Sequence, residues 1–277
     1  MPGNKVVLIT GASSGIGRAT AQLLASRGYT VFGTSRNPFN SVRASGYELL
    51  PLNVCSDQSA QDCVNTLIQK AGRLDVLINN AGHALAGAIE EATLEQAKAQ
   101  FETNFFGMIR MVNCSLPVMR AQSSGHIVNV GSGASIGRAP FFGIYAASKC
   151  AVDGYTEALW HELRPLGIKV SVVQPWFSKS NLMTSAQYGE KRIDDYQPWR
   201  DRGVSILQEF LNNGEDAEEV ADCILGLLRS HHPALYYCVG KKTGAMALLR
   251  RFLPQSAFGR LVRRFLKIDV SNVTEGM

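Results

Sequence analysis

The sequence predicts a single-domain α/β protein built on a doubly wound parallel sheet of about seven strands, and three observations lead to this fold class. Short apolar runs alternate along the chain with longer stretches of helical periodicity, as in βαβ units. The apolar runs are continuous, which is typical of parallel strands buried on both faces. The 277 residues are enough to bury a substantial core in one domain.

The elements alternate in a regular order. We expect strands at 5–10, 30–35, 47–54, 75–82, 125–133, 168–175 and 234–239. Helices are expected at 15–28, 56–72, 93–119, 145–163 and 216–230, the third with a bend near 104–107. Residues 177–215 form one long irregular stretch that is too apolar for a free linker, which predicts a lid over a site.

Composition and charge narrow the function classes. The chain is 45% hydrophobic and 18% charged, as expected for an ordinary globular domain. Residues 1–240 carry 20 basic and 21 acidic side chains, and so neutral a body argues against nucleic-acid binding. The six cysteines show no C-x-x-C spacing, so we expect buried thiols, a cytoplasmic location and no metal site.

The excess positive charge lies in a tail at 241–277, which follows a catalytic domain at 1–240 and carries 8 basic and 2 acidic side chains. Two amphipathic helices are expected within 244–267, separated at Pro254. An apolar stripe is made of Phe258, Leu261, Val262, Phe265 and Leu266, and the cations beside it are Arg260, Arg263, Arg264 and Lys267. Three interpretations are open: the stripe packs on the body or a partner subunit, closes over a substrate pocket, or lies on an anionic membrane surface.

The segment "TGASSGIG" at 10–17 follows the first strand and opens the first helix. Gly11 permits the tight turn, Gly15 lets the chain approach a pyrophosphate, and Gly17 lets the helix pack close to the strand. The first-turn N–H groups and the helix dipole can then hold phosphate. In a first βαβ unit, this loop predicts a Rossmann-like dinucleotide site.

The end of the second strand indicates which dinucleotide binds. An NAD site needs an acidic residue there for the ribose 2′-hydroxyl, whereas NADP needs a cation for the 2′-phosphate. The sequence "TSRNP" has no acid and places Ser35 and Arg36 at this point. Because arginine can pair with phosphate through two hydrogen bonds, we expect NADP.

Tyr145 and Lys149 in "YAASK" are spaced so that they share one face of a helix. A phenol has an ordinary pKa of about 10 and is a poor base at neutral pH. An ammonium group beside it favours the phenolate and lowers that pKa. The spacing therefore predicts that Tyr145 exchanges protons.

Five motifs in order resemble the short-chain dehydrogenase/reductase family over residues 5–240. They are "TGASSGIG", "NNAG" at 79–82, Asn104 in "TNFFG", Ser132 in "VNVGSGAS", and Tyr145 with Lys149, thirteen residues after Ser132. The resemblance implies that Tyr145 is the general acid, that Ser132 stabilises the developing alkoxide, and that Lys149 lowers the Tyr145 pKa and holds the nicotinamide ribose. Asn104 is implied to order a water molecule for proton resupply.

The resemblance also implies a set of cofactor contacts in the loops that follow the strands. These are Gly11, Ser13, Ser14, Gly15, Ile16, Gly17, Ser35, Arg36, Asn53, Val54, Asn80, Ala81, Gly82, Tyr145, Lys149, Pro175, Ser178 and Ser180. The sequence departs from the family in "PWFSKS", where Trp176 occupies a position that is usually glycine. Trp176 is expected either to shape the substrate pocket or to pack under the lid.

The expected substrate is a bulky, apolar small molecule, bound in a pocket lined by His83, Gly133, Phe141, Phe142 and Trp176. The layout looks like the NADP-dependent hydroxysteroid, retinol and aldehyde reductase branches. The predicted function is an NADP(H)-dependent oxidoreductase that interconverts a carbonyl group and an alcohol. One alternative is a non-catalytic NADP-binding sensor or assembly protein. Another is an epimerase or dehydratase of nucleotide-linked sugars, but the sequence has no sizeable second substrate domain, which counts against that reaction. A homodimer or homotetramer is expected because members of the family commonly associate.

Overall fold

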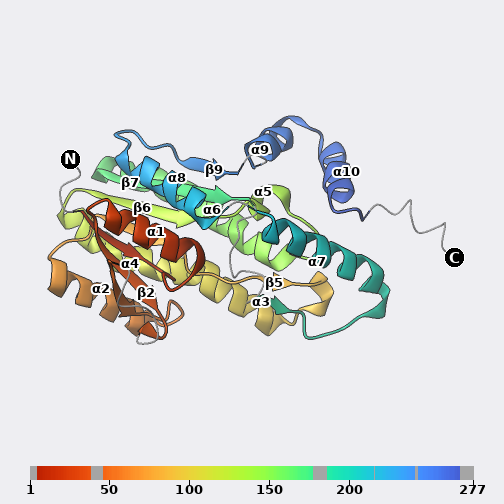
Figure 1. Ribbon diagram of the computed structural model, residues 1–277, viewed down its shortest axis with the longest axis horizontal. Coiled ribbons are helices and arrows are strands. Elements are labelled where there is room, and N and C mark those ends of the chain that lie inside the picture. The colour runs from red at the N-terminus through yellow and green to blue at the C-terminus, as the bar shows by residue number, and fades with distance from the viewer. Residues whose placement is uncertain (1–4, 39–45, 177–185, 215, 241–242, 269–277) are drawn as a thin grey trace.

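A parallel sheet forms the centre of the molecule in the computed structural model, which describes residues 5–38, 46–176, 186–214, 216–240 and 243–268 (Figure 1). Within these residues the sheet has seven strands in the order β3-β2-β1-β4-β6-β7-β9. Their bounds are β1 (Val6–Ile9), β2 (Thr30–Ser35), β3 (Glu48–Pro51), β4 (Val76–Asn79), β6 (Gly125–Val130), β7 (Ile168–Pro175) and β9 (Tyr236–Val239). Every neighbouring pair is parallel, which confirms the predicted fold class.

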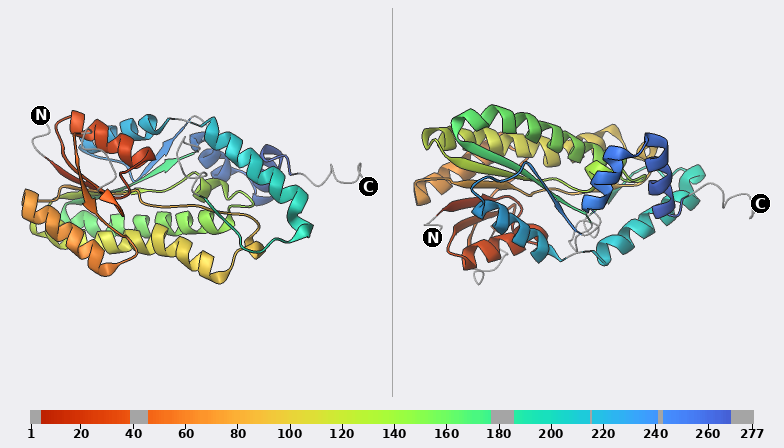
Figure 2. Two further views of the ribbon diagram at one scale, coloured as in Figure 1. Left: turned by 60° about the horizontal axis from the view of Figure 1, so that its bottom comes forward. Right: turned by 90° about the horizontal axis from the view of Figure 1, so that it is seen from above.

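Helices cover both faces of the sheet, as Figure 2 shows from two sides. One face carries α2 (Asp57–Ala71), α4 (Gly107–Ala121) and α6 (Gly143–Leu163), and the other carries α1 (Gly15–Ser26) and α8 (Ala217–Arg229). Strand β1 shows why its sequence is continuously apolar: Val6 and Leu8 pack into the first layer, whereas Val7 and Ile9 pack into the second. Both faces are buried, so neither set of alternate positions can be polar.

The long helix expected at 93–119 is interrupted where the bend was predicted. Helix α3 (Leu94–Phe101) leads into a π-helical turn, η3 (Glu102–Phe106), and then into α4. The Gly107 N–H donates to the Glu102 carbonyl, so one residue is added to the turn. Such turns are frequent at functional sites, and this one buries Asn104.

The described part of the stretch expected to be irregular, residues 186–214, is largely helical. They contain η5 (Asp194–Tyr196) and a sixteen-residue helix, α7 (Gln197–Asn212). The spacing of the buried residues Val204, Leu207 and Leu211 is helical, and this was the available signal. Residues 177–185 and 215 lie outside the described residues.

Several short elements had no clear sequence signal. Strand β5 (Leu85–Ala86) pairs in parallel with β8 (Gln187–Tyr188) as a separate two-stranded sheet. The others are η2 (Ile89–Glu91), α5 (Ala134–Gly137) and η4 (Arg164–Leu166). All six cysteines are free, but only Cys63 is buried and Cys238 is exposed, so the expectation of buried thiols was wrong for most of them.

The tail forms two helices on either side of Pro254, as predicted: α9 (Thr243–Phe252) and α10 (Gln255–Phe265). They lie with α5 and α7 at the end of the molecule toward which the arrows of β7 and β9 point (Figure 1). Phe258, Val262 and Leu266 are buried in one apolar cluster with residues of α7. The tail stripe therefore packs on the body of the protein.

Candidate active site

Ser132, Tyr145 and Lys149 meet at the carboxyl end of β6. Ser132 lies just beyond this strand, while Tyr145 and Lys149 lie one turn apart near the start of α6. Their exposed fractions are only 8%, 6% and 6%. Tyr145 forms a hydrogen bond with Ser132, and the ring of Phe142 packs edge-on against its ring at 5.9 Å. The structure thus brings together the three residues that the sequence singled out.

The electrostatics differ from the expectation that Lys149 lowers the pKa of Tyr145. Burial raises the pKa of Tyr145, and the hydrogen bond with Ser132 only partly offsets this effect. The Lys149 Nζ atom lies 6.0 Å from the centre of the Tyr145 ring and donates to the Val130 carbonyl at 2.8 Å. Burial lowers the pKa of Lys149 itself to about 8, while the charge of Asp153 opposes this shift.

Asp153 is a neighbour of the site that sequence reasoning missed. It lies one turn after Lys149 on α6, and burial raises its pKa to about 6 despite hydrogen bonds and the Lys149 charge. Its Oδ2 atom accepts from Gln174 Nε2 at 2.7 Å, and the same nitrogen lies 3.2 Å from the Ser135 hydroxyl. The Ser135 hydroxyl donates to the Ser132 carbonyl at 2.8 Å. A polar chain therefore links the carboxyl group to the backbone of Ser132. The four-residue spacing between Lys149 and Asp153 was the sequence signal that could have identified Asp153.

Asn104 holds the loop that follows β4. Its Oδ1 atom accepts from the His83 N–H at 3.0 Å, and its Nδ2 atom donates to the His83 carbonyl at 3.0 Å and to the Ser148 hydroxyl at 3.2 Å. Asn104 and Lys149 line the same small pocket, together with Thr10, Asn79 and Ala81 among others. Burial, and then the charges of Arg36 and Lys149, lower the pKa of His83, so its ring is neutral at pH 7.

The glycine loop has the geometry that a phosphate group requires. Gly11 and Gly15 have φ of +66° and +52°, in the left-handed region that favours glycine. A Cβ atom on Gly17 would lie 2.3 Å from the Gly11 carbonyl oxygen, so only glycine fits. Ser13 and Ser14 are exposed, Ser14 makes no side-chain capping bond, and the first turn of α1 has no acidic residue. These features leave the helix N-terminus suited to an anion.

Asn80 ties the loops after β1 and β4 together. Its Nδ2 atom donates to the carbonyls of Thr10 and Gly11, both at 3.0 Å. The backbone N–H groups of Asn80 and Ala81 both donate to the Thr10 hydroxyl at 2.9 Å. The Asn80 side chain thus fixes the glycine loop through its Thr10 and Gly11 carbonyl groups.

The remaining predicted cofactor residues lie at the ends of neighbouring strands. After β2, the Ser35 hydroxyl accepts from the Asn37 N–H at 3.2 Å, and Arg36 is exposed. Val54 lines the small pocket, and Gly82 lies against Asn104. The Pro175 carbonyl accepts from the Gly133 N–H. Asn53 is exposed, and Ile16, the second residue of α1, is half-buried. Ser178 and Ser180 lie outside the described residues.

A second pocket, with a volume of about 70 Å³, opens beside Ser132 and Tyr145. Gly133, Phe142 and Trp176 line it, as predicted for the substrate, but His83 and Phe141 do not. Phe141 packs instead against Gly203 of α7. Further wall residues come from α7, which lies in the stretch predicted as a lid, and from the tail, for whose stripe closure of a substrate pocket was one open interpretation. They are Leu207, Leu211, Met246, Val262, Phe265 and Leu266. The tail stripe therefore also closes one side of this pocket.

Trp176 fills space that two glycines leave open. A Cβ atom on Gly133 would lie 2.2 Å from the indole Cε3 atom, and one on Gly137 would lie 3.2 Å from its Cη2 atom. The described non-glycine residues with positive φ are Ser123, Arg138, Phe141 and Lys267, so the backbone at Trp176 does not require glycine. Trp176 shapes the pocket, which was one of its two expected roles.

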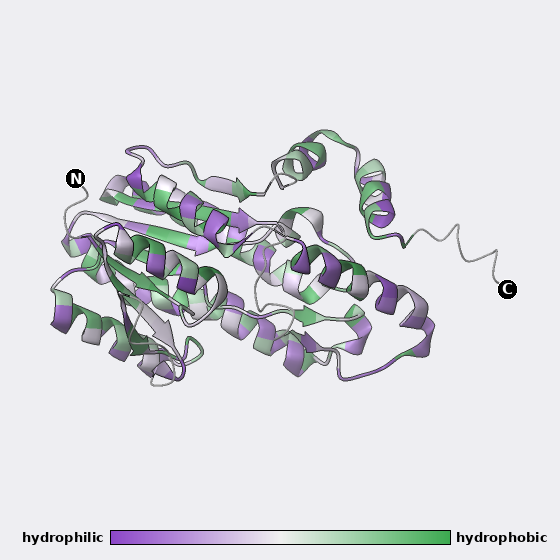
Figure 3. Cartoon of the chain, viewed as in Figure 1, coloured by the Kyte–Doolittle hydropathy of each residue, from purple (hydrophilic) through white to green (hydrophobic). Residues whose placement is uncertain are grey.

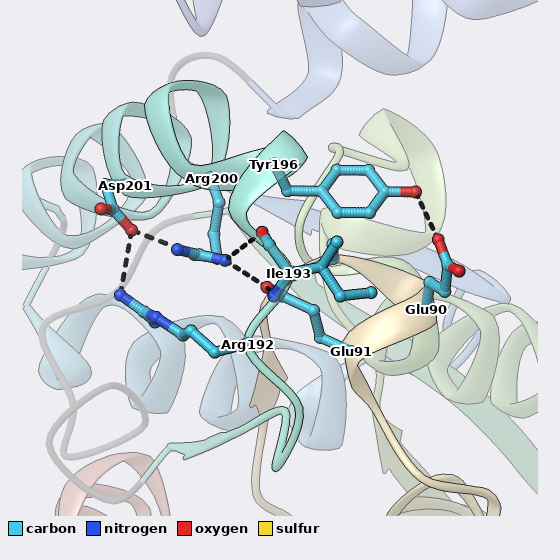
Figure 4. Close-up of polar contacts among 8 residues, drawn as sticks. Glu90, Glu91, Arg192, Ile193, Tyr196, Arg200 and Asp201 are labelled. Carbon is cyan, nitrogen blue, oxygen red and sulfur yellow. Dashed lines mark hydrogen bonds and ion pairs between the residues drawn. The ribbon is translucent and has the colours of Figure 1, made fainter.

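A buried ion pair anchors α7, the helix that carries Leu207 and Leu211. Arg200 and Glu91 are each 2% exposed and form a salt bridge (Figure 4). Glu91 also accepts from the backbone N–H groups of Ile193 at 3.0 Å and Ala88 at 3.1 Å. Close by, the Tyr196 hydroxyl donates to Glu90 at 2.9 Å. These contacts fasten the pocket wall to the loop after β5.

Sequence comparison finds the same family along most of the chain. A family model described as short chain dehydrogenase matches residues 5–191. Over 267 residues the chain is 35% identical to the 3-ketodihydrosphingosine reductase of Bacteroides thetaiotaomicron, covering 95% of this chain and 98% of that protein. It is 34% identical over 251 residues to retinol dehydrogenase 8 of Bos taurus, covering 83% and 80% of the two chains.

Solved structures share the fold. A short-chain dehydrogenase from Streptomyces avermitilis matches with a TM-score of 0.80 at 29% identity, over 100% of this chain and 99% of that one. A family member from Burkholderia phymatum in complex with NAD matches with a TM-score of 0.79 at 26% identity, over 90% and 93%. ElxO with NADP bound gives 0.71 at 25% identity, over 87% and 99%.

Two of these solved structures hold a nicotinamide dinucleotide, NAD in one and NADP in the other. The protein thus belongs to the short-chain dehydrogenase family and is an oxidoreductase that interconverts carbonyl and alcohol groups with a nicotinamide cofactor.

Proposed function

We propose that the protein is an NADP(H)-dependent reductase of bulky apolar ketones or aldehydes, with Tyr145 as the proton donor. One observation carries the proposal: the side chains of Ser132 and Tyr145 line a pocket whose other wall residues, apart from Arg138, are apolar. A carbonyl oxygen can reach the two hydroxyl groups only if the rest of the substrate is buried among aliphatic and aromatic side chains. Such a site selects apolar molecules that carry one polar group.

The protonation states favour reduction. Because burial raises the pKa of Tyr145, its hydroxyl keeps its proton at pH 7 and can donate it to a carbonyl oxygen that becomes an alkoxide. Ser132 donates a second hydrogen bond to the same oxygen as negative charge develops there. Lys149 has a pKa of about 8 and is mostly protonated at pH 7, so its charge stabilises Tyr145 after the proton has left. We assign proton resupply to the small pocket that Lys149 and Asn104 share.

The bound nicotinamide cofactor supplies the hydride. The glycine loop would hold its pyrophosphate, and Arg36 would pair with the 2′-phosphate of NADP at the end of β2, where the chain has no acidic residue. Val54, Asn53 and Ser35 surround the expected adenosine. Arg36 is exposed, so pairing with the 2′-phosphate would not require its guanidinium to be uncovered first.

The names of two relatives, a 3-ketodihydrosphingosine reductase and a retinol dehydrogenase, give the first compounds to assay. The test uses the purified full chain with NADPH and a series of methyl ketones that differ only in alkyl-chain length. Each methylene buried in the pocket should raise kcat/KM by about fourfold until the pocket is full. Tyr145→Phe serves as the matched control for background reduction. An activity that does not change with chain length, or that favours charged substrates, would contradict the proposal.

A further inference from the structure

Helix α9 exposes an unusual cluster of apolar side chains. Nine large hydrophobic residues are exposed in the described parts of the chain, and three of them fall within five residues of α9. Phe252 is 73% exposed and Leu248 is 59% exposed, one turn apart on the same face, with Leu249 beside them. The exposed Arg251 borders them, with its guanidinium 5.9 Å from the centre of the Phe252 ring, whereas the half-buried Arg250 packs over the Phe258 ring of α10. An exposed apolar patch bordered by cations is typical of an interaction surface.

Helix α10 adds a face of positive charge. Arg260, Arg263 and Arg264 are spaced so that they share one face of α10, Lys267 follows just beyond the end of the helix, and all four are exposed. Phe258 and Val262 are buried on the opposite face. Figure 3 shows the resulting mixture of hydrophilic and hydrophobic residues on this helix. Residues 243–268 contain six basic side chains and no acidic ones.

The same two helices form a wall of the candidate substrate pocket. Met246 comes from α9, and Val262 and Phe265 come from α10. Their pocket-lining residues lie beside Ser132 and Tyr145, where the proposed carbonyl chemistry takes place. The helices that carry the exposed apolar and basic side chains therefore also line the candidate substrate pocket.

We propose that α9 and α10 bind the surface of a membrane that contains anionic phospholipid. Leu248 and Phe252 would insert among the acyl chains, while the cations of α10 attract the head groups. A second copy of this chain is a poorer occupant because it would bring two strongly basic surfaces together. No helix in the described residues has both the length and the apolar character needed to cross a bilayer, so the contact lies in the plane of the interface. Binding to the membrane does not depend on the proposed function. Only the further step, in which an apolar substrate passes from the bilayer to the pocket beside these helices, rests on it.

Vesicle co-sedimentation of the full chain, without cofactor or substrate, tests this surface. The protein should pellet with vesicles of phosphatidylcholine and phosphatidylglycerol, pellet less with phosphatidylcholine alone, and be released by salt. Replacing both apolar residues, Leu248→Ser with Phe252→Ser, should weaken binding at least about tenfold. Leu94→Ser, at a residue of α3 that is 64% exposed, is the matched control and should bind like the parent chain. Arg260→Ser with Lys267→Ser should weaken binding to the anionic vesicles only.

Two results would overturn the proposal. The parent chain could stay in the supernatant with anionic vesicles, or the double serine variant could bind as tightly as the parent. Loss of a dimer in sedimentation velocity, without any vesicle binding, would assign the patch to a second copy instead. Unchanged reduction of a short, water-soluble ketone verifies that the variants are folded. A chain that binds vesicles but reduces no ketone would contradict the proposed function and leave the membrane surface intact.

Discussion

Gly133 and Trp176 are complementary in size: a Cβ atom on Gly133 would lie 2.2 Å from the indole ring. The backbone of Gly133 has φ −57° and ψ −16°, which alanine adopts without strain. Any cost of adding a methyl group there therefore comes from the contact with Trp176 and not from the backbone.

Gly133→Ala should lower the free energy of unfolding by about 1–3 kcal/mol, because it overpacks a buried contact. The same substitution should cost much less when Trp176 is already replaced by alanine, which a double-mutant cycle of Gly133→Ala and Trp176→Ala in denaturant titration measures. Gly154→Ala is the matched control: its Cβ atom would meet nothing within 4 Å in helix α6, so it should stabilise by about 0.5–1 kcal/mol. Equal effects at Gly133 and Gly154 would contradict the packing described for Trp176.

Asp153→Asn should shift the pH dependence of kcat/KM. The Asp153 carboxylate raises the pKa of Lys149, so its removal lets Lys149 lose its proton below about pH 8 and moves the alkaline limb to lower pH. Below about pH 6 the two enzymes should converge, because Asp153 in the parent protein is then protonated as well. Glu157→Gln, one turn further along the helix and exposed, should leave the profile unchanged. Alkaline limbs that coincide for Asp153→Asn and the parent would show that Asp153 does not act on Lys149.

Glu91→Gln should destabilise the protein by about 3–5 kcal/mol, because it removes the buried partner of Arg200 and leaves that buried charge with only the half-exposed Asp201 carboxylate. Burial alone would raise the pKa of Glu91, but backbone hydrogen bonds and Arg200 together lower it. Its stabilisation is therefore present above the ordinary carboxyl pKa and is lost as the pH falls through the lower value of the folded state.

Urea unfolding and KM measure this ion pair. Asp201→Asn is the control, since Asp201 also pairs with Arg200 but its side chain is 50% exposed, and it should cost no more than about 1 kcal/mol. KM should rise in Glu91→Gln because α7 carries Leu207 and Leu211 of the pocket wall. Similar losses in both variants would mean that the buried pair does not anchor the wall.

Arg36→Ala should reduce the preference for NADPH over NADH in kcat/KM by about tenfold to a hundredfold, the value of a lost charged hydrogen-bond pair. Arg18→Ala, on the exposed side of α1, removes the same charge away from the end of β2 and should preserve the preference. A ratio that is the same in the parent and in Arg36→Ala would assign the dinucleotide choice to other residues.

Much of the fold could be predicted because its signals are local. Each continuous apolar run became a strand, and the bend near Asn104 became a π-helical turn. Helix α7 was missed because its apolar residues pack in a separate cluster beside the pocket and not against the central sheet. The "DDYQPW" segment before it also carries no clear signal for a helix start. Strands β5 and β8 have two residues each, and so short a pairing leaves no periodicity in the sequence.

The candidate site was predictable where a motif names its residues, and much less so where three-dimensional packing decides. Ser132, Tyr145 and Lys149 were identified by type and spacing, and they do meet. The raised pKa of Tyr145 was not foreseen, because the depth of burial that causes it is a property of the folded protein. The pocket wall from α7, α9 and α10 comes from segments far apart in the chain, which no local pattern connects.

The central claim is that the Tyr145 hydroxyl transfers the proton, and Tyr145→Phe tests it most directly. Phenylalanine keeps the ring that packs against Phe142, so the melting temperature and the affinity for NADPH should be unchanged. Steady-state reduction of the best ketone should show a kcat lower by about 10²–10⁴-fold. A variant that binds NADPH normally and keeps more than about a tenth of kcat would contradict the claim.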